Sequence, residues 1–170
     1  VLLAELIEAC AWVSSREDVK VLVVTGNGPN FSAGFDLDDF RGLDSSSTDR
    51  RATADLGRRA AEALTNVDAL TIAAVRGHCV GGGLVLVAAC DLRVAAAGTR
   101  FAIPEVDLGI PLAWGGIPRL VREIGPARTK ELVLSCRPFG AEEAAAIGMV
   151  NRVMDDAAFD TEVATWAVEL

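Results

Sequence analysis

Two short segments rich in small residues each follow a strand-like run and could present backbone amides to a ligand. Residues 31–37 read Phe-Ser-Ala-Gly-Phe-Asp-Leu, and residues 80–84 read Val-Gly-Gly-Gly-Leu. Small residues around Gly34 let the backbone approach a ligand and leave the amide of Phe35 free to donate. The triplet at 81–83 opens a helical pattern, where the first amides lack partners within the helix. Two loops that each aim an amide at one oxygen would form an oxyanion hole, although each run alone also fits a tight turn.

A third segment, residues 104–109, places a carboxylate directly after a proline. Its sequence is Pro-Glu-Val-Asp-Leu-Gly. Glu105 could act as a general acid and base on a bound substrate. The alternative is an acidic residue in the first turn of a helix, where the helix dipole stabilises it. Periodicity does not decide between these two interpretations, and both remain open.

The composition excludes several classes of protein. The chain has 170 residues, of which 51% are hydrophobic, and 16 basic against 24 acidic side chains give a net charge of −8. This balance argues against a nucleic-acid or anionic-membrane partner, and no apolar run approaches the roughly 18 residues of a membrane span. With one His and no Tyr, we expect no His-rich metal site. Any chemistry must come from carboxylates, backbone amides, Ser, Cys, Lys or Arg.

The cysteines form no Cys-X-X-Cys pair, and three of the four lie within apolar runs: Cys10, Cys79, Cys90 and Cys136. We expect buried, reduced thiols, which are typical of a cytoplasmic protein. Cys79 adjoins His78, but neighbours in an extended segment point to opposite faces, which disfavours a Cys-His nucleophile. We expect His78 to be a hydrogen-bonded structural residue.

The pattern of apolar residues predicts strands that alternate with helices. Apolar runs predict strands at residues 20–25, 70–75, 91–95, 100–103 and 149–153. Helical spacing predicts helices within residues 2–13, 49–64, 77–90, 116–124, 126–136 and 141–147, and from residue 155 onward. Strands that are apolar on both faces imply a largely parallel sheet covered by helices, so we predict an α/β fold. No repeat or linker divides the chain, and we expect one domain over residues 1–170.

Four stretches follow one another along the chain: FSAGFDL at 31–37, AAVRGHCVGGGLVLVAACDLRVA at 73–95, FAIPEVDLGI at 101–110 and GGIPRLVREIG at 115–125. Together they resemble the enoyl-CoA hydratase/isomerase (crotonase) family. The resemblance implies a crotonase-like ββα spiral with helices covering the sheet, assembled as a homotrimer or hexamer. Family members are longer, so we expect residues 1–170 to be a partial core domain without its first strands and C-terminal trimerisation helices.

The resemblance also implies an acyl-CoA thioester as substrate, whose carbonyl oxygen accepts hydrogen bonds from the amides of Phe35 and Gly82. Glu105 would be the catalytic acid and base. Coenzyme A is then part of the substrate, and we expect no separate cofactor and no metal. Trp114 would wall the acyl pocket, unless it only packs beside the glycines that follow it. The expected substrate contacts are Ser32, Ala33, Asp36, Leu37, Gly81, Val85 and Trp114.

One position departs from the family pattern. Family hydratases carry two glutamates that bracket a water; the second falls on Glu105, but the first falls on Val85. A single carboxylate suits the family's Δ3,Δ2-enoyl-CoA isomerases, so we favour double-bond isomerisation. Ala113 stands where the family's dienoyl-CoA isomerases place an acid, which disfavours that activity. A specialised hydratase and a non-catalytic acyl-CoA-binding protein remain alternatives, and Asp36 or Asp107 could compensate for the missing glutamate.

An arginine-rich stretch at residues 41–60 could supply the positive charge that the phosphates of coenzyme A require. It holds five arginines against three aspartates, in contrast to the acidic chain as a whole. A solvated helical face is the alternative. The candidate phosphate ligands are Arg41, Arg50, Arg51, Arg58 and Arg59.

Overall fold

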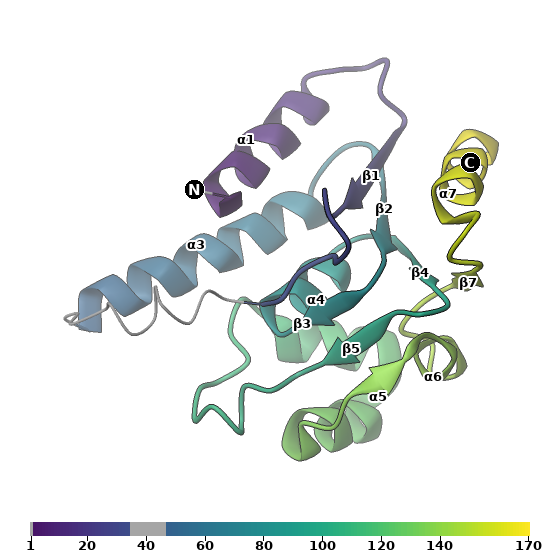
Figure 1. Cartoon of the computed structure of the whole chain (residues 1–170). Coiled ribbons are helices and arrows are strands. Elements are labelled where there is room, and N and C mark those ends of the chain that lie inside the picture. The colour runs from purple at the N-terminus through teal and green to yellow at the C-terminus, as the bar shows by residue number, and fades with distance from the viewer. Residues whose placement is uncertain (1, 35–46) are drawn as a thin grey trace.

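The computed structural model describes residues 2–34 and 47–170, with side chains at 2–34 and 55–170 (Figure 1). Its helices are α1 (Leu2–Ser14), α3 (Ser47–Thr65), α4 (Gly82–Val87), α5 (Gly116–Ser135), α6 (Ala141–Ala146) and α7 (Phe159–Glu169). Its strands are β1 (Val21–Thr25), β2 (Leu70–Val75), β3 (His78–Val80), β4 (Leu92–Ala96), β5 (Arg100–Ala102), β6 (Phe139–Gly140) and β7 (Arg152–Met154). None of these helices is long and apolar enough to cross a membrane.

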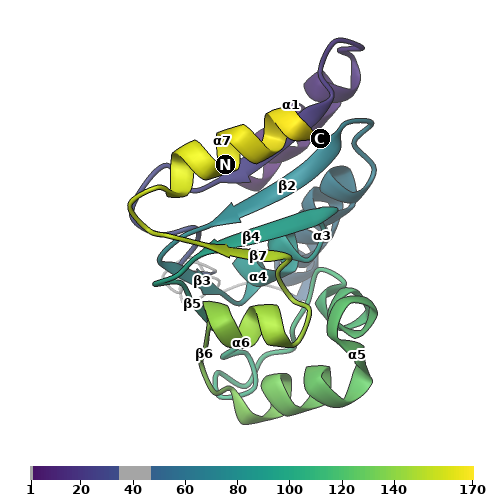
Figure 2. The same ribbon diagram turned by 90° about the vertical axis from the view of Figure 1, so that its right-hand side faces the viewer.

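Four strands form a parallel sheet in the order β1-β2-β4-β7. Successive residues of a strand point to opposite faces, and in β2 Ala73 and Val75 join one apolar cluster whereas Ile72 and Ala74 join another. Helices α1, α3 and α4 pack on the first face and α7 packs on the second (Figure 2). The predicted parallel sheet with helices on its faces is confirmed.

A second, smaller sheet positions the candidate site. Strands β3 and β5 run parallel, with Cys79 opposite Phe101, and β6 pairs antiparallel with β5. Because the carboxyl ends of parallel strands lie at the same edge of a sheet, the residues that follow β3 and β5 emerge side by side. The Gly81 amide extends this pairing by donating to the Ala102 carbonyl oxygen at 2.9 Å. The sheet thus brings the glycine triplet next to the segment that contains Glu105.

The structure differs from the prediction mainly at the short strands. Residues 78–80 lie within the helix predicted at 77–90 but form strand β3, because they pair with β5, so the helix begins only at residue 82. Strand β6 was not predicted, because two residues are too few to show an alternating pattern. Helix α5 consists of two helical segments that meet at Gly125, whose φ of 76° and ψ of 165° are not helical, so the two helices predicted at 116–124 and 126–136 are confirmed. The strand predicted at 149–153 is shorter and later, because the Met149 amide closes the end of α6 instead of pairing in the sheet.

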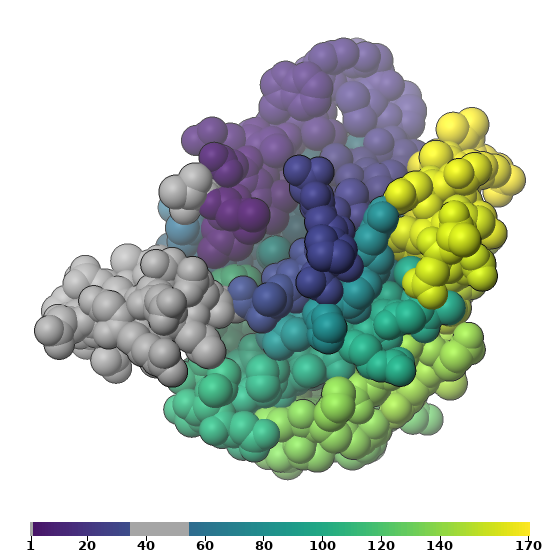
Figure 3. Space-filling view, in the orientation of Figure 1, coloured from purple at the N-terminus to yellow at the C-terminus, as the bar shows by residue number. Residues whose placement is uncertain are grey.

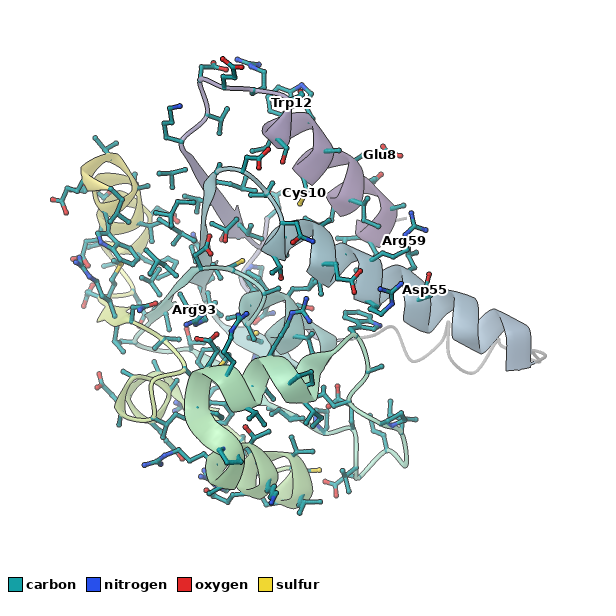
Figure 4. The ribbon with its side chains drawn as sticks, turned by 180° about the vertical axis from the view of Figure 1, so that it is seen from behind. Glu8, Cys10, Trp12, Asp55, Arg59 and Arg93 are labelled. Atoms are coloured by element: carbon teal, nitrogen blue, oxygen red, sulfur yellow. The ribbon has the colours of Figure 1, made fainter. Side chains whose placement is uncertain are left out.

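A buried arginine fixes the C-terminal end of α4. Arg93 is 5% exposed and donates hydrogen bonds to the carbonyl oxygens of Cys90 and Met149, both at 2.8 Å (Figure 4). It also forms an ion pair with Glu123 at 2.5 Å. Arg122 pairs with the other carboxylate oxygen of Glu123 and donates to the carbonyl of the residue that follows α4. Arg93, Arg122 and Glu123, which we call the arginine clamp, hold α4 against α5.

Candidate active site

The two glycine-containing segments lie side by side. The Ser32 amide donates to the His78 carbonyl oxygen, and the Val80 amide donates to the Ser32 carbonyl oxygen, both at 3.0 Å. Gly34 has φ 96°, and a Cβ atom there would lie 3.3 Å from the carbonyl oxygen of Val80. Figure 3 shows this segment, in dark blue, on the surface beside the teal part of the chain. The backbone of Gly34 therefore reaches the residue that precedes the triplet.

The residues that follow Gly34 include three of the predicted contacts. Phe35, Asp36 and Leu37 lie outside the described residues. Of the other predicted contacts in this segment, Ala33 is exposed, whereas Ser32 is partly buried and accepts a hydrogen bond from the Gly34 amide at 3.2 Å. The role of the Phe35 amide as a donor stays a prediction.

Each glycine of the triplet at 81–83 makes room for a predicted site residue. A Cβ atom on the first would lie 2.5 Å from Oε1 of Glu105, one on the second would overlap the ring of Trp114, and one on the third would lie 2.6 Å from Cβ of Ser32. Such contacts are closer than real Cβ atoms make. The triplet is therefore the point at which three predicted site residues, distant in sequence, come together.

The amides of the triplet are not equivalent. The Gly81 amide is occupied, because it donates to the carbonyl oxygen of Ala102. The Gly82 amide is the first of helix α4 and makes no hydrogen bond within the described part of the chain. An amide at this position has no carbonyl partner in its own helix. Gly83, the second residue of α4, likewise makes no amide hydrogen bond within the described residues, so Gly82 and Gly83 both have amides that could donate to a ligand. The role of Gly82 as the donor stays a prediction from the resemblance.

Glu105 is a buried carboxylate with one unused oxygen. Its side chain is 8% exposed, and among the described residues Oε2 has no hydrogen-bond partner. Burial raises the pKa of this carboxyl above its ordinary value, because the charged form loses hydration. Residues 105–109 form a turn rather than a helix, so the interpretation of Glu105 as a first-turn helical residue is wrong. A carboxyl with a raised pKa next to an open backbone amide is suited to accept and return a proton.

The position of the missing glutamate is filled with hydrocarbon. Val85 is fully buried, and its Cγ2 lies so close to Gly116 that a Cβ atom there would be 2.7 Å away. Leu112 packs against the same glycine. Asp107 is exposed, and Asp36 lies outside the described residues. Val85 therefore offers no polar atom to a water, and among the described residues Glu105 is the carboxylate that contacts the triplet.

Trp114 is wedged between two glycines from different helices. A Cβ atom at Gly57 in α3 or at Gly82 in α4 would overlap its indole ring. Trp114 itself has a left-handed backbone, with φ 59°. Sequence reasoning missed Gly57, although a glycine inside a helix costs about 1 kcal/mol relative to Ala and so signals a packing requirement.

The adjacent His78 and Cys79 do not form a nucleophile pair. Cys79 is fully buried, and burial raises the pKa of its thiol well above the ordinary value. His78 is exposed, and its Nδ1 lies 3.0 Å from Oδ1 of Asn30, as expected for a structural histidine. All four cysteines are buried free thiols, as predicted. Among the side chains at 2–34 and 55–170, no group of three or more His, Cys, Asp or Glu residues could hold a metal ion.

The five arginines proposed for phosphate binding differ in their surroundings, and the structure describes the side chains of two of them. Arg58 forms ion pairs with Asp55 and Glu62 of the same helix, both at 2.6 Å, which favours the solvated helical face for this residue. Arg59 is exposed (Figure 4). Phosphate contacts stay a prediction for Arg59 and for three arginines whose side chains lie outside the described residues: Arg41, Arg50 and Arg51.

Known proteins are similar to this chain in sequence and in fold. The family model for enoyl-CoA hydratase/isomerase matches residues 1–170. The chain is 37% identical to a crotonyl-CoA hydratase from Syntrophomonas wolfei, over 89% of this chain and 58% of that protein. It is 36% identical to the mevalonyl-coenzyme A hydratase sidH of Aspergillus fumigatus, over 89% of this chain and 56% of that protein. The crystal structure of an enoyl-CoA hydratase from Bacillus anthracis matches with a TM-score of 0.94 and 31% identity, over 99% of this chain and 65% of that one.

Fold and site together define a crotonase-like protein, with a glycine triplet and a glutamate at the carboxyl ends of two parallel strands. The chain belongs to the enoyl-CoA hydratase/isomerase family. The crotonase fold that the sequence led us to expect is confirmed. The chain spans 56% and 58% of the length of the two curated relatives named above. Its assembly as a homotrimer or hexamer stays a prediction.

Proposed function

We propose that this protein binds an acyl-CoA thioester and moves its double bond by a single-glutamate mechanism. The amides of Phe35 and Gly82 donate hydrogen bonds to the thioester oxygen, and Glu105 transfers the proton. The observation that carries this proposal comes from the described residues. A buried carboxylate oxygen of Glu105 and the amide of Gly82 have no hydrogen-bond partner among them, and Gly82 is one residue from the glycine that Glu105 contacts.

The favoured reaction converts a 3-enoyl-CoA into a 2-enoyl-CoA. The carboxylate of Glu105 removes a proton from C2, and the electrons move into the thioester to give a dienolate. The negative charge on the thioester oxygen is stabilised by the two amides, and loss of one such donor typically costs about 100- to 1,000-fold in rate. The protonated Glu105 then returns the proton to C4, so that the double bond lies between C2 and C3. One carboxyl group, whose pKa burial raises above its ordinary value, serves both steps.

A specialised hydratase is the second candidate, and the names of the relatives favour it. The two curated relatives are a crotonyl-CoA hydratase and a mevalonyl-coenzyme A hydratase. Hydration of a 2-enoyl-CoA adds water across the double bond, which requires a positioned water as well as a proton donor. Because Val85 is a buried hydrocarbon side chain, that water would need another polar group. A non-catalytic acyl-CoA-binding protein is the third candidate.

Product analysis separates the three candidates. The purified protein is incubated with 3-hexenoyl-CoA and, separately, with 2-hexenoyl-CoA, and the products are separated by chromatography. We expect 2-hexenoyl-CoA from the first substrate and little 3-hydroxyhexanoyl-CoA from the second. Rapid formation of the 3-hydroxyacyl product would instead support the hydratase. Binding of both ligands by calorimetry without turnover would support the non-catalytic protein.

A further inference from the structure

The indole of Trp114 lies directly against the proposed oxyanion donor. Gly82 supplies the open amide, and the same residue has no room for a Cβ atom because the ring of Trp114 occupies that space. Glu105 contacts the preceding residue, Gly81. A thioester held by the Gly82 amide is therefore flanked by the carboxylate that moves its proton and by a large aromatic ring.

This ring is held in place more firmly than an ordinary surface aromatic. It is seated on Gly57 of α3 as well as on Gly82 of α4, and a side chain at either glycine would collide with it. Its own backbone is left-handed, with φ 59°, a conformation that L-residues adopt rarely and at a cost. Trp114 is also only partly buried, so the residue is not enclosed on every side. A fixed ring in a partly exposed residue fits a wall of a binding site.

We propose that Trp114 limits the acyl group to short chains by filling the space between α3 and the first turn of α4. This proposal rests on the proposed function and adds a substrate class to it. The acyl chain extends from the thioester carbon that Gly82 holds, and the indole occupies the apolar space next to that glycine. Short enoyl groups fit beside the ring, whereas longer chains collide with it.

The alternative is that Trp114 only packs α3 onto α4. Loss of packing lowers stability and slows every substrate in the same proportion. A size limit predicts something different, because removal of the ring changes the preference between substrates. A hydrophobic pocket discriminates by about 10- to 200-fold for each methylene that it accepts or excludes.

The experiment compares the wild-type protein with Trp114→Ala on 3-butenoyl-, 3-hexenoyl-, 3-octenoyl- and 3-decenoyl-CoA. We expect the wild type to prefer the shortest substrates. The ratio of kcat/KM for decenoyl to kcat/KM for butenoyl should rise by at least about tenfold in Trp114→Ala, mainly through a lower KM for the long chain. Trp12→Ala is the matched control, because Trp12 lies on α1 and is 58% exposed; this variant should keep the wild-type ratio.

The outcomes keep the two proposals apart. A wild type that turns over no enoyl-CoA overturns the proposed function itself. A wild type that is active but prefers decenoyl-CoA, or a Trp114→Ala protein with the wild-type ratio, overturns only the size limit. Thermal unfolding shows whether Trp114→Ala is folded. If it is not, Trp114→Phe provides the same test, with a shift in the same direction and of smaller size.

Discussion

The two ends of helix α4 are built in opposite ways. At the C-terminal end, Arg93 and Arg122 donate to main-chain carbonyl oxygens and share both carboxylate oxygens of Glu123. At the N-terminal end, within the described residues, the Gly82 amide and Oε2 of Glu105 have no hydrogen-bond partner. One helix thus has a saturated end and an open end.

The difference places the polar groups that are free to bind a ligand at the N-terminal end of α4. An unpaired polar group in the interior typically costs about 1–3 kcal/mol, more if it is charged. The arginine clamp avoids this cost and fixes the position of α4, whereas the first turn of α4 retains the cost. A thioester bound there would accept a hydrogen bond from the Gly82 amide, and its acyl group would exchange a proton with Glu105. The arginine clamp at the C-terminal end matters for the N-terminal end, because it fixes the position of α4. A hydrogen-bond donor such as the Gly82 amide can stabilise a developing charge only if its position is fixed.

We expect the largest effect on activity from Glu105→Gln, next to the N-terminal end of α4. Glutamine keeps the shape of the side chain but cannot accept the proton, so kcat for 3-hexenoyl-CoA should fall by about 100- to 10,000-fold. Glu142→Gln is the control, because Glu142 is an exposed carboxylate in the first turn of α6. Its activity should equal that of the wild type, and a Glu105→Gln protein that retains full turnover would remove Glu105 from the mechanism.

The second effect is on the saturated end, from Arg93→Met. The substitution leaves two main-chain carbonyls without their donor and Glu123 with Arg122 alone, and breaking a buried ion pair from one side typically costs about 3–5 kcal/mol. Urea unfolding should show this loss. In the control Arg16→Met, which breaks an exposed ion pair with Asp18, the free energy of unfolding should barely change. Equal stabilities of the two variants would contradict the role of the arginine clamp.

The smallest effect is a dependence of stability on pH at the open end. Burial raises the pKa of Glu105, so the folded protein holds this proton at a pH where the unfolded chain has released it. The bound proton therefore contributes to the free energy of unfolding. This contribution is fully present below the ordinary carboxyl pKa and is lost as the pH rises through the raised pKa of the folded protein. Glu105→Gln cannot show this loss, so its free energy of unfolding should rise relative to the wild type over that interval. Urea titrations from acidic to neutral pH measure the difference, and parallel curves for the two proteins would contradict it.

Local patterns were enough to predict the main strands and the segments of the site. The runs at β1, β2 and β4 are long enough to be identified by composition, and the triplet at 81–83 and Glu105 follow strand-like segments within a few residues. The short strands β3 and β6 carry no such pattern, so the second sheet that aligns these segments was not predicted.

The remaining features of the site depend on tertiary packing, which local sequence patterns do not predict. The triplet predicted open amides, but the structure shows that Gly81 uses its amide in the sheet and that each glycine also seats a side chain. The contact between Gly57 and Trp114 joins residues of different elements, and nothing in either local pattern connects them. Pairings of this kind depend on how α3, α4 and the loop before α5 pack in three dimensions.

A crystal structure with a bound, unreactive acyl-CoA analogue tests the central claim most directly. We predict that the thioester oxygen accepts a hydrogen bond from the Gly82 amide and that Oε2 of Glu105 faces C2 of the acyl group. A thioester bound away from the first turn of α4, or a Glu105 side chain turned away from C2, would contradict the account.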